Sequence, residues 1–109
     1  MDFATYQVES REFANYPNVG NNYVYPTIGL SGETGEVSEK IKKIIRDKNG
    51  FYSDDDIEAI TKELGDVLWY LGAIASEFQI DLDTIATQNI EKLRSRKERG
   101  VLHGSGDNR

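Results

Sequence analysis

The chain has 109 residues, enough for one compact domain but not for separate substrate and cofactor domains. Hydrophobic residues make up 38% of it and charged residues 29%, which indicates a folded core under a strongly charged surface. With 13 basic and 19 acidic residues the formal net charge is -6, which disfavours binding to nucleic acid or to anionic lipid. Because cysteine is absent and there is one histidine, thiol nucleophiles, disulfides and zinc sites of thiolate or clustered imidazole are excluded.

The sequence shows neither a membrane-spanning segment nor an export signal. No apolar run approaches the roughly 20 residues that span a bilayer. The first residues, Met1 to Ala4, contain no basic region followed by an apolar stretch. We therefore expect a cytoplasmic protein that contacts no membrane.

Glycine and proline divide the chain into four segments. The first, about residues 2–15, carries apolar side chains at spacings that predict a short amphipathic helix. Residues 15–26 predict a loop, because they contain two prolines and several asparagines. That loop brings three tyrosines together, namely Tyr16, Tyr23 and Tyr25.

Two longer helices are predicted in the middle of the chain. Residues 28–47 carry apolar side chains at three- and four-residue spacings, which is typical of a helix with one apolar stripe. The next helix follows Ser53 or Asp54, either of which can cap it, and the acidic run there suits the positive end of a helix dipole. Its apolar stripe extends to Phe78.

The fourth helix begins near Asp81 or Asp83 and ends in a basic run, Arg94 to Arg99, which suits the negative end of the dipole. No segment alternates with period two over enough residues to predict a strand. We therefore predict a single all-α domain over residues 1–109, with four antiparallel helices arranged like a bundle. Residues 101–109 lack apolar periodicity, so we expect them to form a tail that is flexible or ordered by a partner.

Two acidic pairs flank the apolar stripes of the second and third helices. Glu33 and Glu36 share one helix face, and Glu63 and Asp66 repeat the spacing. If the helices pack antiparallel, the four carboxylates converge at one edge, where repulsion and loss of water require a cation. Carboxylate ligands alone favour Mg²⁺, or Mn²⁺ in its place, over zinc or copper.

Spacing alone leaves another interpretation open, because E-x-x-E pairs are common on the solvated faces of acidic helices. Three glycines favour the interpretation that the acidic pairs form a metal site. Gly32, Gly35 and Gly65 adjoin the acids inside predicted helices, where each costs about 1 kcal/mol relative to alanine. Close helix approach or ligand access would account for them.

A local positive patch lies at residues 89–100, which hold five basic and two acidic residues. Asn89 falls on the apolar face of its helix and needs hydrogen-bond partners if it is buried. Lys92 and Arg96 lie four residues apart on one flank, where they could contact phosphate oxygens. The ordinary alternative is that the basic residues complement the helix dipole and that Asn89 bridges helices.

Three further residues lie beside the acidic pairs in the pattern. Lys40 falls close to the side of its helix that carries the first pair, unlike the other lysines nearby. Trp69 and Tyr70 follow the second pair, and aromatic faces at a pocket edge can stack on a nucleobase. For Trp69 a role in the core or in a subunit contact is the alternative.

The run Gly32 to Glu36, followed after 26 residues by Glu63-Leu64-Gly65-Asp66, resembles the signature of the MazG-type all-α nucleoside triphosphate pyrophosphohydrolases. Asn89 to Arg96 resembles their third motif block, and the likeness covers about residues 23–100. It implies a helical fold that assembles as a homodimer or homotetramer, with sites completed near subunit contacts. It also implies a Mg²⁺ site formed by Glu33, Glu36, Glu63 and Asp66.

The resemblance implies a reaction as well, in which water cleaves a nucleoside triphosphate between its α and β phosphates and releases pyrophosphate. Of the four carboxylates, we expect Glu36 to orient or deprotonate the water. Tyr70 and Asn89 match positions that line the nucleotide pocket, and Lys92 and Arg96 would meet phosphates.

Two alternative functions remain at this stage. The related phosphoribosyl-ATP pyrophosphohydrolases share the chemistry, and a noncatalytic helical oligomer that binds nucleotides or a partner belongs to another class. The chain also departs from the family pattern at one position, because Gly32 stands where a further acid is common. Glu39 lies one turn after the first pair and could take that place, so the number of metal ions stays open.

Overall fold

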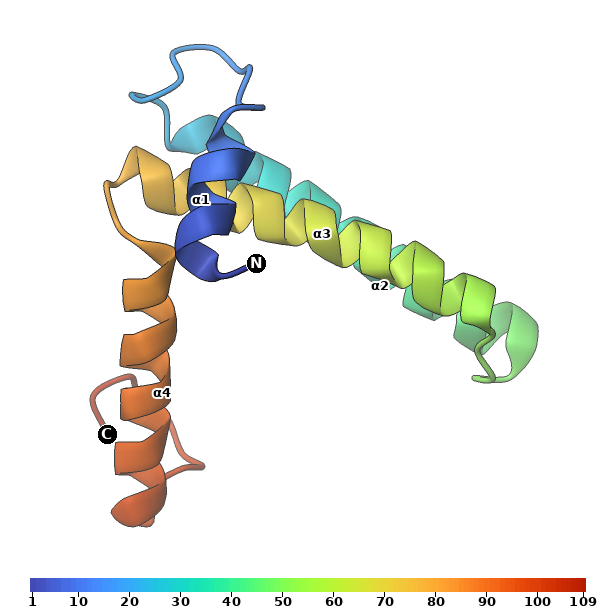
Figure 1. Cartoon of the computed structure of the whole chain (residues 1–109). Helices are drawn as coiled ribbons and strands as arrows, with labels where there is room; N and C mark the ends of the chain where they lie inside the picture. The colour runs from blue at the N-terminus through green and yellow to red at the C-terminus, as the bar shows by residue number, and fades with distance from the viewer.

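The computed structural model describes all 109 residues and contains four helices and no strand (Figure 1). The helices are α1 (Phe3–Arg11), α2 (Val24–Lys48), α3 (Asp54–Glu77) and α4 (Leu82–Glu98). The predicted all-α fold class is therefore confirmed. None of the four combines the length and the apolar composition that crossing a bilayer requires.

Local sequence explains where the helices begin and end. The Asp2 side chain caps α1 by accepting a hydrogen bond of 2.8 Å from the Thr5 backbone N–H. Ser53 caps α3 in a capping box, in which its hydroxyl accepts from the Asp56 N–H and the Asp56 carboxylate accepts from the Ser53 N–H. Asn49 ends α2 in the left-handed conformation, with φ of 54°.

The start of α2 differs from the sequence prediction. The pattern places Tyr25 and Pro26 in a loop, whereas the helix already begins at Val24. Pro26 lies in the first helical turn, where its missing N–H costs no helical hydrogen bond, and its side chain is buried. The loop is therefore confined to residues 12–23, and Tyr25 is held on a helix.

The antiparallel pair formed by α2 and α3, called here the hairpin, is the main packed unit of the chain (Figure 1). The short α1 packs across α3 and also contacts α4. Gln7 of α1 fixes that junction, because its side chain donates to the Ile80 carbonyl and accepts from the Leu82 N–H, both at 2.9 Å. The N-terminal helix thus fastens the end of the hairpin to the start of α4.

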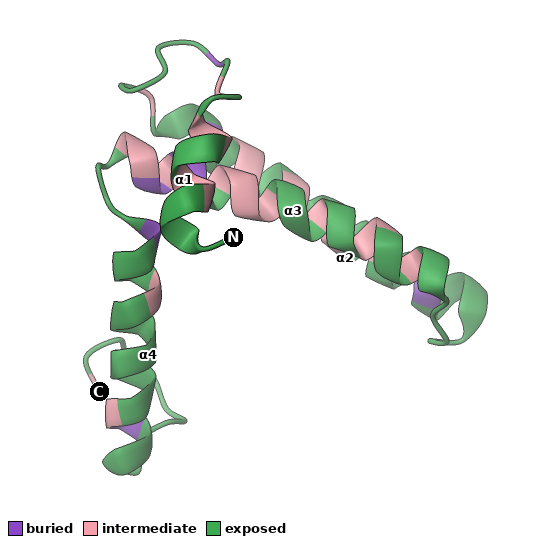
Figure 2. Cartoon of the chain, viewed as in Figure 1, coloured by how far each residue is buried: buried purple, intermediate pink, exposed green.

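The fourth helix does not lie beside the hairpin. Within this chain α4 packs against α1, makes no comparable contact with α2 or α3, and projects away from them (Figure 1). Leu82 and Arg96 are its buried residues, and most of its length is exposed (Figure 2). Four helices are present as predicted, but one chain alone does not close them into a bundle.

Two measurements show how open this arrangement is. The radius of gyration is 16.9 Å, whereas a compact domain of 109 residues has about 13 Å. The accessible surface is 8026 Å², against about 6,100 Å² for a compact monomer of 12.3 kDa. The excess carries many large apolar side chains, including Ile28, Ile41, Ile45, Ile57, Leu64, Leu71, Ile90 and Leu93.

The C-terminal residues 101–109 fold back along the end of α4. The buried Arg96 guanidinium donates to the Asp107 carbonyl at 2.7 Å. Arg109 donates to the carbonyls of Leu102 and Gly106 at 2.8 and 2.7 Å. The tail thus has a defined path in this structure, and its backbone oxygens satisfy a guanidinium that α4 would otherwise expose.

Candidate functional site

Three carboxylates from two helices converge on the hairpin. Glu33 of α2 and Glu63 and Asp66 of α3 each place an oxygen within 4.8 Å of the other two. The side chains of Glu33 and Glu63 are half-buried and Asp66 is exposed, so the group can be reached from solvent. We call these three residues the acidic group.

The electrostatics of the acidic group are those of unneutralised negative charge. Burial, followed by the charges of Asp66, Glu63 and Glu36, raises the pKa of Glu33 above its ordinary value. The nearest cation is Lys40, whose Nζ lies 3.9 Å from Glu63 Oε1. One lysine at that distance leaves most of the negative charge without a partner.

The donor set fits a hard divalent cation. All three potential ligand atoms are carboxylate oxygens, and His103, the chain's one histidine, lies in the C-terminal tail. Mg²⁺ and Mn²⁺ prefer oxygen ligands, and Mg²⁺ typically takes one or two carboxylates and completes its shell with water and phosphate oxygens. The cluster can therefore hold such an ion and leave positions for a phosphorylated ligand.

Glu36 lies near the acidic group but not within it. Its side chain is exposed on α2, one turn after Glu33. Its carboxylate is not among the oxygens that meet within 4.8 Å, although Glu63 and Asp66 have the same three-residue spacing and both belong to the group. The charge of Glu36 still contributes, after Asp66 and Glu63, to the raised pKa of Glu33.

Tyr70 extends the site along the hairpin toward the start of α2. A Cβ added to Gly29 would lie 2.2 Å from Tyr70 Cε1, so the ring rests directly on the α2 backbone. Burial, and then Tyr25, Glu33 and Asp66, raise the pKa of the Tyr70 phenol. Tyr70 therefore borders the acidic group on one side and the first turn of α2 on the other.

The glycine that permits close approach is Gly29, which the sequence pattern does not single out. Nothing lies within 4 Å of a Cβ added to Gly32, Gly35 or Gly65. Within one chain, close helix approach does not account for these three glycines. The explanation for glycine at these positions is then access for a ligand or contact with a second chain.

Trp69 is turned toward α1 rather than toward the acidic group. Its Nε1 donates to the Ser10 carbonyl at 3.1 Å. Its ring meets Tyr70 edge-on, with centroids 5.1 Å apart and an interplanar angle of 88°. Trp69 thus ties α1 to α3 and supports Tyr70 from the side.

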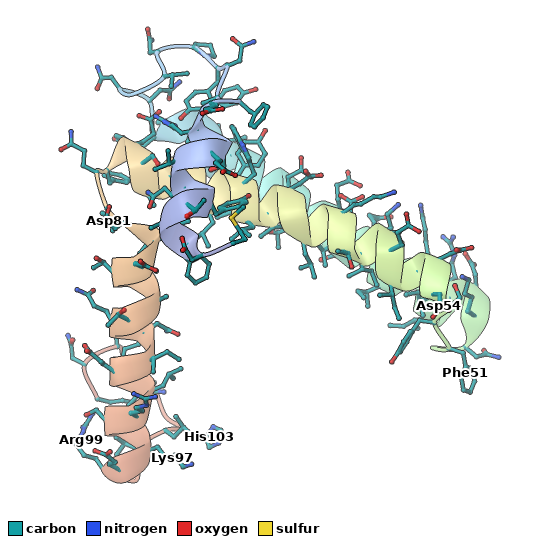
Figure 3. All side chains as sticks on the ribbon, in the orientation of Figure 1. Phe51, Asp54, Asp81, Lys97, Arg99 and His103 are labelled. Atoms are coloured by element: carbon teal, nitrogen blue, oxygen red, sulfur yellow. The ribbon has the colours of Figure 1, made fainter.

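The three candidate residues of α4 are not brought to the acidic group within one chain. Asn89 and Lys92 are exposed on a helix that projects from the hairpin, and Lys97 and Arg99 mark its far end in Figure 3. Lys92 Nζ and Arg96 Nη2 lie 3.7 and 3.6 Å from Asp107 Oδ1 of the tail. Their cationic groups face the C-terminal residues in this structure.

Sequence reasoning missed a second acidic centre at Glu77, whose side chain is 1% exposed. Its carboxylate accepts hydrogen bonds from Arg11 Nη2, from the Tyr16 hydroxyl and from the backbone N–H groups of Gly20 and Asn22. We call this the Glu77 network. Its signal in the sequence is weak, namely an acid that stands within the apolar stripe of its helix, between Ile74 and Phe78.

The Glu77 network reverses the effect of burial on its carboxylate. Burial alone would raise the pKa of Glu77, but the hydrogen bonds from Tyr16, Gly20, Asn22 and Arg11 lower it to about 2. Glu77 is therefore ionised at neutral pH and fixes the loop of residues 12–23 against α1 and α3.

Comparison with known proteins identifies the family. A model of the MazG nucleotide pyrophosphohydrolase domain matches residues 27–101. The chain is also 43% identical, over a 114-residue alignment that covers 100% of both proteins, to "Gene 37 protein" of Mycobacterium phage L5. No solved structure matches the chain. Because the domain match covers well over half of the sequence and contains the whole acidic group, the chain belongs to the MazG nucleotide pyrophosphohydrolase domain family.

Proposed function

We propose that this protein hydrolyses nucleoside triphosphates, with ribose or deoxyribose, between the α and β phosphates, and that Mg²⁺ is its metal and Mn²⁺ a substitute. The products would be a nucleoside monophosphate and pyrophosphate. The observation that carries the proposal is the meeting of Glu33, Glu63 and Asp66 within 4.8 Å. Membership of a nucleotide pyrophosphohydrolase family supports it.

The acidic group is where the metal would be held. A divalent cation bound there supplies positive charge that neutralises phosphate oxygens and favours the departure of pyrophosphate. Lys40 adds a positive charge on the α2 side, 3.9 Å from Glu63, and can donate to a phosphate oxygen. The protein's share of the work is thus mainly charge placement and substrate positioning.

Glu36 is the residue to which we assign the attacking water. It is exposed next to the acidic group but outside it, so its oxygens are free to orient a water and accept its proton. The water oxygen forms a bond to one of the two bridged phosphorus atoms, and the α–β anhydride bond breaks. The proton passes to Glu36 and then to solvent.

We propose that the active form is a homodimer or homotetramer. The chain exposes 8026 Å², about 1,900 Å² more than a compact monomer of its mass, which per subunit is the size of an obligate interface. A second copy covering the apolar face of the hairpin would remove this excess. It would also let Asn89 and Lys92 of one α4 approach the acidic group of another chain, and Arg96 would join them once the tail leaves its guanidinium.

The partner that we propose is a free nucleotide, and neither nucleic acid nor a membrane. A net charge of -6 repels both polyanions, whereas a single triphosphate can be held by a metal and a few cations. Free nucleotides and Mg²⁺ occur together in the cytoplasm, so we place the protein there.

The decisive experiment incubates the protein with a panel of NTPs and dNTPs plus Mg²⁺ and separates the products. We expect monophosphate and pyrophosphate in equal amounts, and loss of the reaction when a chelator removes the metal. Diphosphate with phosphate as products would contradict the proposed bond. Folded, metal-supplied protein that turns over no nucleotide would contradict the proposed function and favour a noncatalytic binding oligomer.

A further inference from the structure

Two tyrosines that the reaction leaves unassigned form a stack at the start of α2. The rings of Tyr16 and Tyr25 have centroids 5.1 Å apart and an interplanar angle of 6°. Tyr16 is 7% exposed, whereas Tyr25 remains 45% exposed. The buried ring is packed within the chain, whereas its outer partner keeps an exposed face on which a flat ligand can stack.

The stack is continuous with the acidic group along one ridge of α2. Tyr25, Gly29 and Glu33 are spaced four residues apart and therefore follow one another on the helix surface. The Tyr70 ring fills the position that the missing side chain of Gly29 leaves open. Eight residues of helix cover about 12 Å, which suits an extended nucleotide with phosphates at one end and a base at the other.

The stack is held rigid from behind by the Glu77 network. Tyr16 donates its hydroxyl proton to Glu77, and Arg11 Nη1 donates to the Tyr16 oxygen at 2.6 Å. A buried polar network in which every member is satisfied fixes the orientation of its side chains. A preorganised ring binds a flat ligand with little further loss of entropy.

We propose that Tyr25 stacks on the nucleobase of the substrate, and that Tyr16 and Glu77 are positioning residues that hold its ring. The inference rests on the proposed function and assigns the residues that bind the base of the nucleotide. Every base has a π-face, so the stack selects for the presence of a base more than for its identity. Inorganic polyphosphates carry no base, so they would bind only at the acidic group, through the metal held there.

The test compares Tyr25→Ala and Tyr25→Phe with the wild type, using a nucleoside triphosphate as substrate and inorganic tripolyphosphate as competitive inhibitor. Loss of one base–aromatic stack is expected to raise KM about tenfold with little change in kcat. The inhibition constant of tripolyphosphate should stay unchanged, and Tyr25→Phe should restore KM because it keeps the ring. Tyr52→Ala, at an exposed tyrosine in the α2–α3 turn, is the matched control.

The positioning residues are tested by Tyr16→Phe and Glu77→Gln, since Tyr16→Phe removes both hydrogen bonds of the hydroxyl, to Glu77 and from Arg11, while keeping the stacked ring. Both should raise KM for the nucleotide by less than Tyr25→Ala does and leave tripolyphosphate inhibition unchanged. A general structural defect would weaken both ligands together, which would overturn the positioning role.

Three results would overturn the stacking role of Tyr25. They are equal weakening of nucleotide and tripolyphosphate binding by Tyr25→Ala, an unchanged KM for the nucleotide, and a raised KM that is accompanied by a changed oligomeric mass. A wild type without turnover would instead contradict the proposed function. Equilibrium binding of a nonhydrolysable triphosphate analogue and of tripolyphosphate to the same variants then still tests the stack.

Discussion

Two acidic centres involve α3 about three helical turns apart, and the structure treats them in opposite ways. Glu77 is buried and receives hydrogen bonds from an arginine, a tyrosine and two backbone N–H groups. Glu33, Glu63 and Asp66 meet within 4.8 Å and have one lysine at 3.9 Å. The first centre is complete within the chain, whereas the second lacks positive charge.

The pKa values of the carboxylates also differ between the two centres. That of Glu77 is lowered to about 2, and that of Glu33 is raised by burial and by its acidic neighbours. A carboxylate whose charge is satisfied inside the protein stabilises the fold, and a group whose charge is not satisfied marks a place for a ligand. The contrast supports a structural role for Glu77 and supports the proposal that the acidic group holds a metal.

The largest expected effect is on activity. Glu36→Gln should lower kcat by roughly 10²–10⁴-fold, the range for loss of a catalytic acid or base. Asp66→Asn should lower activity strongly as well, because it removes a carboxylate from the group that would hold the metal. Circular dichroism should show that the helices persist. Glu58→Gln, an exposed α3 acid paired with Lys62, should behave like the wild type. Activity that survives both substitutions would show that the acidic group and Glu36 are not the site.

Glu77→Gln should act mainly on stability, whereas the substitutions at Glu36 and Asp66 should act mainly on activity. Removing a buried, fully hydrogen-bonded charge and leaving Arg11 without its partner is expected to cost about 3 kcal/mol of unfolding free energy. Urea denaturation measures the change, and Asp66→Asn is its counterpart without such a cost. If Glu77→Gln were as stable as the wild type, the Glu77 network would not hold the loop.

Lowering the pH should reduce the stability of the fold through the Glu77 network. The pKa of Glu77 is about 2 when folded against an ordinary 4.5, so the unfolded chain takes up this proton first as the pH falls. Its contribution, on the order of 3 kcal/mol, is complete above pH 4.5 and is lost between about pH 4.5 and 2. Glu77→Gln should flatten this part of the stability curve, and an unchanged slope would contradict the low pKa.

The stability effect that depends on concentration is the response to metal, which is smaller than that of Glu77→Gln at any Mg²⁺ concentration below about 100 times the dissociation constant. Mg²⁺ at about 100 times its dissociation constant should stabilise the wild type by about 2.7 kcal/mol, and lower concentrations by less. Thermal melts of Asp66→Asn should show little response, while Glu77→Gln should retain the full increment. An equal response in both variants would place the metal elsewhere.

The comparison also shows what could be read from the residues before the fold was known. The helices are predictable because their signals, an apolar side chain every three or four positions and caps such as Ser53, lie within one or two turns. The acidic pairs are predictable for the same reason. Pro26 misleads, because proline marks a loop in the pattern and yet is tolerated in the first turn of α2.

What only the tertiary structure decided depends on residues far apart in the chain. Packing of α2 on α3 selects Glu33 rather than Glu36 for the acidic group, and Glu77 meets Gly20 across 57 positions. The outward course of α4 follows from its contact with α1, which no local pattern records. Periodicity specifies which face of a helix is apolar, but the helix that covers that face is chosen by the free energy of the whole assembly.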